Sequence, residues 1–317
     1  MEKNIVHYNH YVNRIPDNQY STLLKDFFKF GDKKTSYHAQ AKENKGTGHE
    51  YCLELPGRML QFYVRNGAPI MPIRDLGNGI MGSIGEMIGF INGARTLDEL
   101  VSFGCPKSFW KDSVTKEKCA VWGLEEGDLG PGSYGPTFTA LPTHNGRTFN
   151  QITALNNQII TKPFARTNLI NSWYTPLAMG DINQQSPRKV VVAPCHGNQI
   201  QFDVMDDRTM RMTVYQRSSD SPLGLVYNLT QWYAFGMMVA YIGNLTFTWY
   251  THMLPNPQIY DIQFDAVKKL LERPDIALPS LYLRPTREIA DLTKFRRTDF
   301  VLEDYHPHPK MFIPSVV

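Results

Sequence analysis

Apolar residues recur at helical spacing in several parts of the chain. The clearest stretch is 79–103, where Ile80, Ile84 and Met87 are followed by Leu97, Leu100 and Val101. Spacings of three and four place such side chains on one face of a helix, and the pair Asn92-Gly93 interrupts the pattern. The same periodicity predicts helices over Tyr20–Phe30, Gln151–Ile160 and Tyr227–Ile242, and an amphipathic segment over Gln258–Glu272.

Alternating or continuous apolar runs predict the strands. They cover Glu50–Val64, which fits one or two strands, and Lys189–Ala193, Gln199–Val204, Met210–Tyr215 and Leu245–Tyr250. The intervening segment Gly104–His144 is rich in glycine and proline, which predicts a long irregular stretch of the kind that often carries function. Because helices and strands are mixed without βαβ regularity, we expect the α+β class with a large mixed sheet and packed helices.

The distribution of polar residues predicts the domain organisation. Residues 1–42 are polar apart from one short amphipathic helix, so we interpret them as an N-terminal segment. We expect residues 43–317 to form one larger domain. The chain has 317 residues, of which 42% are hydrophobic and 20% charged, so a sizeable core is expected and a disordered, charge-dominated chain is excluded.

Charge and cysteine content narrow the class of function. Lys and Arg total 33 against 30 Asp and Glu, and no dense basic block is present, so nucleic-acid binding is not required. The four cysteines form no CxxC pair, which argues against a disulfide scaffold or zinc ribbon, and no metal site is predicted. The N-terminus lacks an apolar run and Leu229–Ile242 is too short to span a bilayer, so we expect a cytoplasmic protein without membrane contact.

The most informative chemistry lies between residues 193 and 228. The sequence APCHG contains Cys195 and is followed by YQRSSD and LGLVYN. A buried cysteine is usually a small hydrophobic residue, but here it follows a predicted strand in a proline-bounded turn. Arg217 on a nearby strand would favour the reactive thiolate. Arg217, Ser218 and the loop around Lys45 can also bind an anionic group such as phosphate, while Asp220 and Asn228 suit a planar heterocycle.

These residues give the chain a family resemblance. It resembles the thymidylate synthases and related pyrimidine nucleotide hydroxymethylases from about residue 43 to the C-terminus. The matching pieces are APCH with Gln201-Phe202, YQRSSD with LGLVYN, GDLGP leading to Tyr134-Gly135, Asn171-Ser-Trp173 and the terminal HPHPKMFIPSVV. The resemblance implies a homodimer, a pyrimidine nucleoside monophosphate as substrate and 5,10-methylenetetrahydrofolate as cofactor.

Residue roles implied by the resemblance define a candidate active site. Cys195 would add to C6 of the pyrimidine and make C5 nucleophilic, with Tyr134 beside it. Glu86 would organise water for proton transfers, although a solvated helix acid is the alternative. Asn228 would read the O4/N3 edge of the base, which favours uracil, whereas a carboxylate there would suit cytosine. The other substrate-binding positions are Arg217, Ser218, Asp220, Lys45, Gln216, His252, His196 and Arg166, the last reaching across the dimer interface. The cofactor-binding positions are Trp122, Asp220 and Gly224.

Departures from the family pattern bear on the product. Cys119 stands where the family has the first of two tryptophans and Trp122 keeps the second, while Leu254 replaces a ribose-contacting tyrosine. Losing an indole beside the reactive intermediate would admit water, so we expect hydroxymethylation of dUMP. Alternatively, a neighbouring side chain fills the gap and the enzyme methylates dUMP to dTMP with release of dihydrofolate. Hydroxymethylation of dCMP or CMP, and a non-catalytic nucleotide- or RNA-binding protein, are further alternatives.

Overall fold

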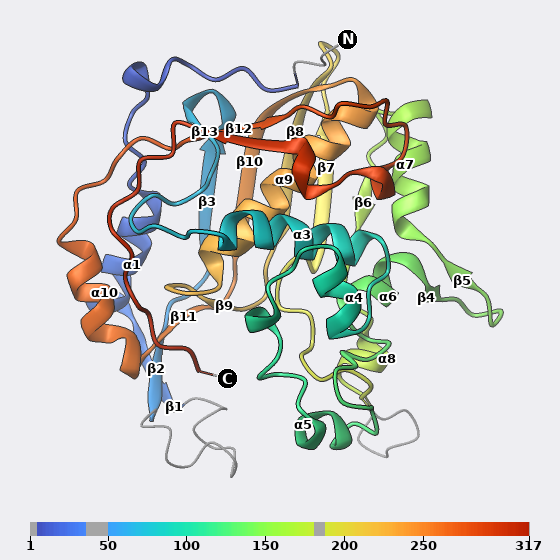
Figure 1. The fold of residues 1–317 in the computed structure, drawn as a ribbon, viewed down its shortest axis with the longest axis horizontal. Helices are drawn as coiled ribbons and strands as arrows, with labels where there is room; N and C mark the ends of the chain where they lie inside the picture. The colour runs from blue at the N-terminus through green and yellow to red at the C-terminus, as the bar shows by residue number, and fades with distance from the viewer. Residues whose placement is uncertain (1–4, 36–49, 181–187, 317) are drawn as a thin grey trace.

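The largest element of the fold is a five-stranded mixed sheet (Figure 1). The computed structural model describes residues 5–35, 50–180 and 188–316. The strands lie in the order β3 (Arg58–Tyr63), β10 (Thr246–Leu254), β8 (Thr209–Tyr215), β7 (Gln199–Val204) and β6 (Leu169–Ile170). The pair β10–β8 is parallel and the other pairs are antiparallel. Side chains alternate between buried and more exposed along β8, so one face of this sheet is covered and the other is open.

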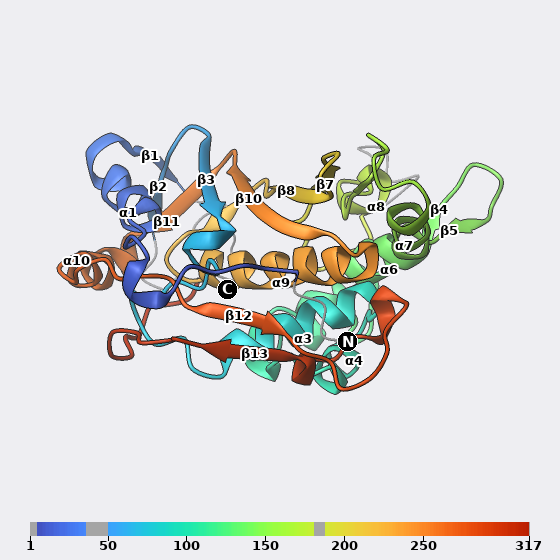
Figure 2. The ribbon, with the colours of Figure 1, turned by 90° about the horizontal axis from the view of Figure 1, so that it is seen from above.

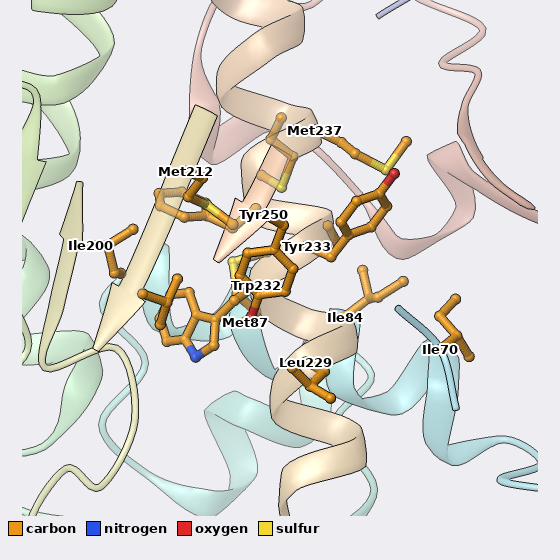
Figure 3. Close-up of a cluster of buried hydrophobic side chains, with 14 of the residues drawn as sticks. Ile70, Ile84, Met87, Ile200, Met212, Leu229, Trp232, Tyr233, Met237 and Tyr250 are labelled. Atoms are coloured by element: carbon orange, nitrogen blue, oxygen red, sulfur yellow. The ribbon is translucent and has the colours of Figure 1, made fainter. Parts of the chain in front are cut away.

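Helix α9 (Leu225–Gly243) covers the buried face of the sheet (Figure 2). It lies between the sheet and a layer containing α3 (Gly79–Ile91). Nearly every residue of α9 is buried, which explains why its sequence is apolar on all sides. Figure 3 shows Trp232 and Tyr233 of α9 among side chains from the sheet and from α3, so the main core is built around this helix.

A second, four-stranded sheet lies beside the first and connects the N-terminal helix to the rest of the molecule. Its order is β1 (Asp32–Thr35), β2 (Tyr51–Glu54), β11 (Pro257–Tyr260) and β9 (Ser219–Asp220). Helices α1 (Gln19–Phe30) and α10 (Phe264–Leu271) pack together beside it. Leu24 and Phe27 of α1 belong to the main core. The boundary that we propose at residue 42 lies outside the described residues.

Short elements complete the fold. The helices are α4 (Leu97–Ser102), α5 (Lys116–Ala120), α6 (Tyr134–Thr139), α7 (Gln151–Thr161) and α8 (Thr175–Ala178). Two small antiparallel sheets pair β4 (Leu141–Pro142) with β5 (Thr148–Phe149), and β12 (Ser280–Leu283) with β13 (Phe300–Glu303). Single 3-10 turns are η1 (Tyr11–Asn13), η3 (Val64–Asn66), η4 (Lys107–Phe109), η5 (Asp261–Gln263), η6 (Leu292–Lys294) and η7 (Arg297–Asp299). Within the described ranges, none of the helices has both the length and the apolar content of a bilayer span.

The α+β class with a mixed sheet is confirmed, and most predicted elements are present. Lys189–Ala193 is the clearest error, because it forms no strand. Its backbone pairs outside any sheet instead, since the N–H of Lys189 donates to Leu177 in α8 and the N–H of Val191 donates to Leu129 in a loop. The segment Gly104–His144 is largely irregular, as expected, but also contains η4, α5 and α6. The amphipathic segment from Gln258 begins as strand β11 and becomes helical only later.

Candidate active site

One cavity of about 460 Å³ brings most of the predicted site residues together. Its wall is contributed by α3, the segment 108–113, the start of α6, the turn before β7, the chain after β8 and the first half of α9. Ser315 of the C-terminal tail also borders it. The predicted residues in the wall are Glu86, Tyr134, Cys195, His196, Gln216, Ser218, Asp220, Gly224 and Asn228.

Cys195 lies half-buried in the turn that leads into β7, and Tyr134 holds that turn. The hydroxyl oxygen of Tyr134 accepts the Cys195 N–H at 2.8 Å and lies 3.5 Å from Cys195 Sγ. The ring of Tyr134 packs against the rings of Phe90 and His196, with centroid distances of 4.4 and 4.6 Å. Because this oxygen already accepts a backbone N–H, its own proton is available to the sulfur. Tyr134 is therefore placed to stabilise a Cys195 thiolate.

The environment of Cys195 differs in one respect from the sequence-based expectation. Burial raises the pKa of the Cys195 thiol above its usual value, although the Tyr134 hydrogen bond and the Arg217 charge oppose this effect. Arg217 alone does not produce a thiolate in the ligand-free protein. Its guanidinium instead donates to the carbonyl oxygens of Pro194 and Ala193, at 2.9 and 3.0 Å, and lies over the ring of Trp173. Arg217 thus stabilises the turn that presents the sulfur.

Glu86 is a buried carboxyl group, not a solvated helix acid. It is 5% exposed and projects from α3 into the cavity wall. Burial raises its pKa to about 7, although hydrogen bonds from Trp110 and Cys105 act in the opposite direction. The close approach of residues 103–106 to α3 depends on glycine, because a Cβ at Gly85 would lie 2.7 Å from the carbonyl oxygen of Phe103. That approach brings Trp110 to the carboxyl group.

Trp110 is the site residue that the sequence analysis missed. Its indole N–H donates to Glu86 at 2.5 Å, and its ring meets Tyr134 edge to face at 6.4 Å. Cys119, where the family has a tryptophan, is fully buried outside the cavity wall, and its thiol lies 3.6 Å from the carbonyl oxygen of Asp128. An indole is therefore present beside Glu86, supplied from a different position. The only signal in the sequence was a second tryptophan in the segment before Trp122.

A chain of hydrogen bonds runs behind Asn228. The carbonyl oxygen of Ser218 can only accept, so the Gln216 group 3.0 Å away is its NH₂. Gln216 Oε1 then lies 2.7 Å from His252 Nε2, so this ring nitrogen must carry the proton that the amide oxygen accepts. Tyr250 donates to His252 Nδ1, the other ring nitrogen. Gln216 Nε2 also approaches Asn228 Oδ1 at 3.4 Å. This geometry turns the NH₂ of Asn228 away from Gln216 and makes it available as a donor to a ligand.

Both histidines of the predicted site are buried and neutral. Burial lowers the pKa of His196 and of His252 to about 3. His196 accepts the indole N–H of Trp232 at 3.1 Å and supports the stacked rings. His252 is completely buried and contacts the cavity only through Gln216, so its side chain does not line the predicted ribose site. Neither group can serve as a cationic ligand for phosphate near neutral pH.

Asp220 connects the cavity to the C-terminal tail. Gln263 Nε2 donates to both Asp220 oxygens, at 3.2 and 3.1 Å, and to the carbonyl oxygen of Pro314 at 2.9 Å. The other partner of Asp220 is the N–H of Leu223, at the entrance to α9. Burial raises the pKa of Asp220 to about 6, although the hydrogen bond from Gln263 opposes this effect. The tail therefore rests on a buried polar contact at the edge of the cavity.

Four predicted residues that the structure describes do not line the cavity, namely Arg166, Trp122, Arg217 and His252. Arg166 is exposed in the chain between α7 and β6. Trp122 lies beneath the guanidinium of Arg188, 4.3 Å from the ring centroid, and does not border the cavity. Lys45 falls outside the described residues. Contacts from Arg166 and Trp122 to a ligand in this cavity would need a partner subunit or a rearrangement of the chain.

Comparison with known families agrees with this site. The chain matches the sequence profile described as thymidylate synthase over residues 18–317. It belongs to the thymidylate synthase family. Members of this family carry out folate-dependent transfer to C5 of dUMP-like nucleotides and generally use methylenetetrahydrofolate. The match includes α1 as well as the cavity-forming elements.

Proposed function

We propose that the protein transfers a one-carbon unit from 5,10-methylenetetrahydrofolate to C5 of dUMP and releases 5-hydroxymethyl-dUMP. The observation that carries this proposal is the convergence of Cys195, Tyr134, Glu86 and Asn228 on one cavity of about 460 Å³. That volume lies within the usual range for sites that bind small molecules. Each of the four side chains supplies a group that C5 chemistry on uracil requires.

Addition of Cys195 to C6 is the first step of the proposed reaction. The thiol is protonated in the ligand-free cavity, so its proton must leave as the sulfur attacks, and the Tyr134 hydroxyl then stabilises the sulfur. Attack at C6 moves negative charge onto O4 and makes C5 nucleophilic. The NH₂ of Asn228 is the donor for that oxygen, and a donor of this kind contributes about 3 kcal/mol to transition-state stabilisation.

Glu86 is the proposed acid and base for proton transfer at the ring. A carboxyl group whose pKa is about 7 exists in both protonation states near neutral pH. It can therefore accept the C5 proton and release it to solvent, which leaves the carboxylate free to accept a proton from water later in the reaction. Trp110 holds one carboxyl oxygen and so fixes the direction in which the other faces.

The remaining wall of the cavity fits a folate. Aromatic and aliphatic side chains suited to a flat pterin ring border it, namely Phe109, Trp110, Val192, Leu223 and Tyr227. Asp220 and Gly224 are the predicted folate contacts that lie in the wall. The bound cofactor would supply the methylene carbon. We propose no role for Trp122 within the same subunit, because it lies elsewhere.

The choice of product depends on water near C5. The loss of an indole at Cys119 does not support water entry, because Trp110 already places an indole against Glu86. Hydroxymethylation is supported instead by Ser108, Asp112 and Ser113, whose polar side chains border the same cavity as Glu86 and can hold water. Methylation to dTMP is the second candidate, and the indole of Trp110 against Glu86 favours it by covering the carboxyl group.

We also propose a homodimer formed through the open face of the main sheet. Exposed apolar side chains gather on that face, where Tyr63 of β3 stacks on Trp249 of β10 at 4.8 Å. Arg166 lies close before β6, the edge strand of the same sheet. A partner subunit at this face would allow Arg166 to reach the partner's phosphate site, with Arg217, Ser218 and Lys45 as the ligands from within the subunit.

Trapping the covalent adduct tests the proposed function. Incubation with 5-fluoro-dUMP and methylenetetrahydrofolate should attach both ligands to a peptide containing Cys195, and Cys195→Ala should form no adduct. A folded wild-type protein that forms none would indicate a nucleotide-binding protein instead. Products from dUMP, dCMP and CMP are then identified by mass spectrometry. Hydroxymethylation forms no dihydrofolate, whereas one dihydrofolate per nucleotide would establish methylation.

A further inference from the structure

Gln231 is a buried amide in the cavity wall, and the described part of the chain offers its side chain no hydrogen-bond partner. It lies on α9 one turn after Asn228 and is 0% exposed. Neither Oε1 nor Nε2 has a partner among the described residues. By contrast, the buried amide of Gln151 is paired, since its Nε2 donates to the carbonyl oxygens of Thr137 and Asn171. Proteins pair nearly all buried amides, so an unpaired one facing a ligand cavity calls for a partner that arrives with the ligand.

Glu86 contributes a second polar group to the same cavity, a carboxyl oxygen that can bind a water molecule. Its Oε1 is engaged by Trp110 and Cys105, whereas no partner of Oε2 is found in the described part of the chain. Helices α3 and α9, which carry Glu86 and Gln231, pack directly against each other. A buried water typically needs about three polar partners. The two side chains together supply an acceptor oxygen, an NH₂ donor and a carboxylate.

We propose that Gln231 positions the water molecule that becomes the hydroxyl of the product, with Glu86 accepting its proton. This inference rests on the proposed hydroxymethylation and identifies the residue that decides it. Gln231 is a positioning residue, because it acts through the water. Asn228, one turn earlier on α9, orients the pyrimidine ring, so the two amides would set the base and the water from one helix face.

The step balances without an oxidant or a reductant. The water oxygen bonds to the exocyclic carbon on C5 of the Cys195-bound nucleotide, and its proton moves to Glu86. The electron pair of the exocyclic double bond shifts into the ring and places negative charge on O4, where Asn228 donates. Collapse of that charge re-forms the C5–C6 double bond and expels the Cys195 thiolate. The product carries a hydroxymethyl group and the folate leaves as tetrahydrofolate.

Gln231→Leu tests the inference because leucine keeps the size of the side chain and removes its polar atoms. The matched control is Thr230→Val on the same helix, since Thr230 is equally buried and bonds only its own helix at Val226. Single-turnover release of tritium from C5 reports activation of the ring. Formation of 5-hydroxymethyl-dUMP reports capture of water. Gln231→Ala is the third variant, because it leaves room for water to re-enter.

The expected pattern separates positioning from folding. In Gln231→Leu, tritium release should stay within about twofold of wild type while hydroxymethyl product falls at least about tenfold, the loss expected of one positioned group. Gln231→Ala should recover part of the product, and Thr230→Val should match wild type. The melting temperature of ligand-free Gln231→Leu should be no lower than that of wild type, because leucine leaves no unpaired amide.

Several results would overturn the inference. Wild-type product yield from Gln231→Leu would show that the amide does not hold the water. Loss of the 5-fluoro-dUMP adduct in this variant would assign Gln231 to base binding instead. Either result leaves the proposed function intact. Stoichiometric dihydrofolate from the wild-type enzyme would instead overturn the hydroxymethylase proposal and this inference together.

Discussion

The hydrogen-bond chain behind Asn228 predicts how the enzyme distinguishes uracil from cytosine. Gln216 must donate to the Ser218 carbonyl oxygen, so it also presents a donor to Asn228 Oδ1. The substitution Gln216→Glu removes this donor but keeps an acceptor for His252. The amide of Asn228 then turns over, so that its NH₂ faces the new carboxylate and its oxygen faces the ligand. An oxygen at that place accepts from the amino group of cytosine and offers nothing to uracil O4.

The size of the effect follows from one reversed hydrogen bond. An unpaired buried donor or acceptor costs about 1–3 kcal/mol. Each 1.4 kcal/mol corresponds to about a tenfold change in an equilibrium or rate constant. We therefore expect the dUMP-to-dCMP ratio of kcat/KM to fall by roughly a hundredfold, since dUMP loses and dCMP gains one favourable contact. The assay is release of tritium from C5 of each labelled nucleotide, which is independent of the final product.

Tyr250→Phe is the matched control for this prediction. It removes the outermost donor of the chain but leaves His252 Nε2–H bound to Gln216, so base preference should stay at the wild-type value. A wild-type ratio in Gln216→Glu, measured on protein with a normal melting temperature, would refute the reasoning. An equal shift in Tyr250→Phe would also refute it, because the preference would then not depend on the orientation of Asn228.

Further predictions concern Glu86 and the Cys195 turn. Trp110→Phe removes a hydrogen bond that lowers the pKa of Glu86, so the limb of the pH–rate profile that reports this group should move to higher pH. Glu86 has its pKa raised from 4.5 to about 7, so its ionisation destabilises the fold as pH rises through that interval. Glu86→Gln should therefore be more stable than wild type at pH 8 by about 3 kcal/mol, and equal to it below pH 4, in urea titrations. Gly197 has φ +58° and its Cβ would lie 2.2 Å from Trp232, so Gly197→Ala should lower the melting temperature and slow adduct formation at Cys195.

The sequence predicted the fold best where burial is one-sided. The stretches that became α1 and β7 show clear periodicity, because one face of each packs on the core. Lys189–Ala193 is also apolar but pairs its backbone with helix α8 and a loop, and a short apolar run carries no information about where its hydrogen bonds go. Tertiary contacts therefore decided the outcome at this position.

In the candidate site, too, residues in contiguous motifs were predictable, whereas residues placed by tertiary contacts were not. Cys195 and Asn228 occur in contiguous motifs, and both line the cavity. The place of Trp110 was not predictable, because it depends on how closely residues 103–106 approach α3, and Gly85 permits that approach only in the folded chain. The role of Gln231 was not predictable from sequence either. A single polar residue in an apolar helix does not indicate whether its side chain will find a hydrogen-bond partner in the folded protein.

Burial also explains why the Cys195 thiol and the two histidines of the site are uncharged near neutral pH. It raises the pKa of the Cys195 thiol and of Glu86, and it keeps His196 and His252 neutral. A charged thiolate held in such a cavity would have to be desolvated before any substrate was present. The oriented groups around it, namely the Tyr134 hydroxyl and the Asn228 amide, are neutral dipoles instead. Dipoles fixed in advance stabilise charge where it develops on the sulfur and on O4, and they need little reorganisation when the reaction occurs. The negative charges on the sulfur and on O4 thus form only once a nucleotide is bound.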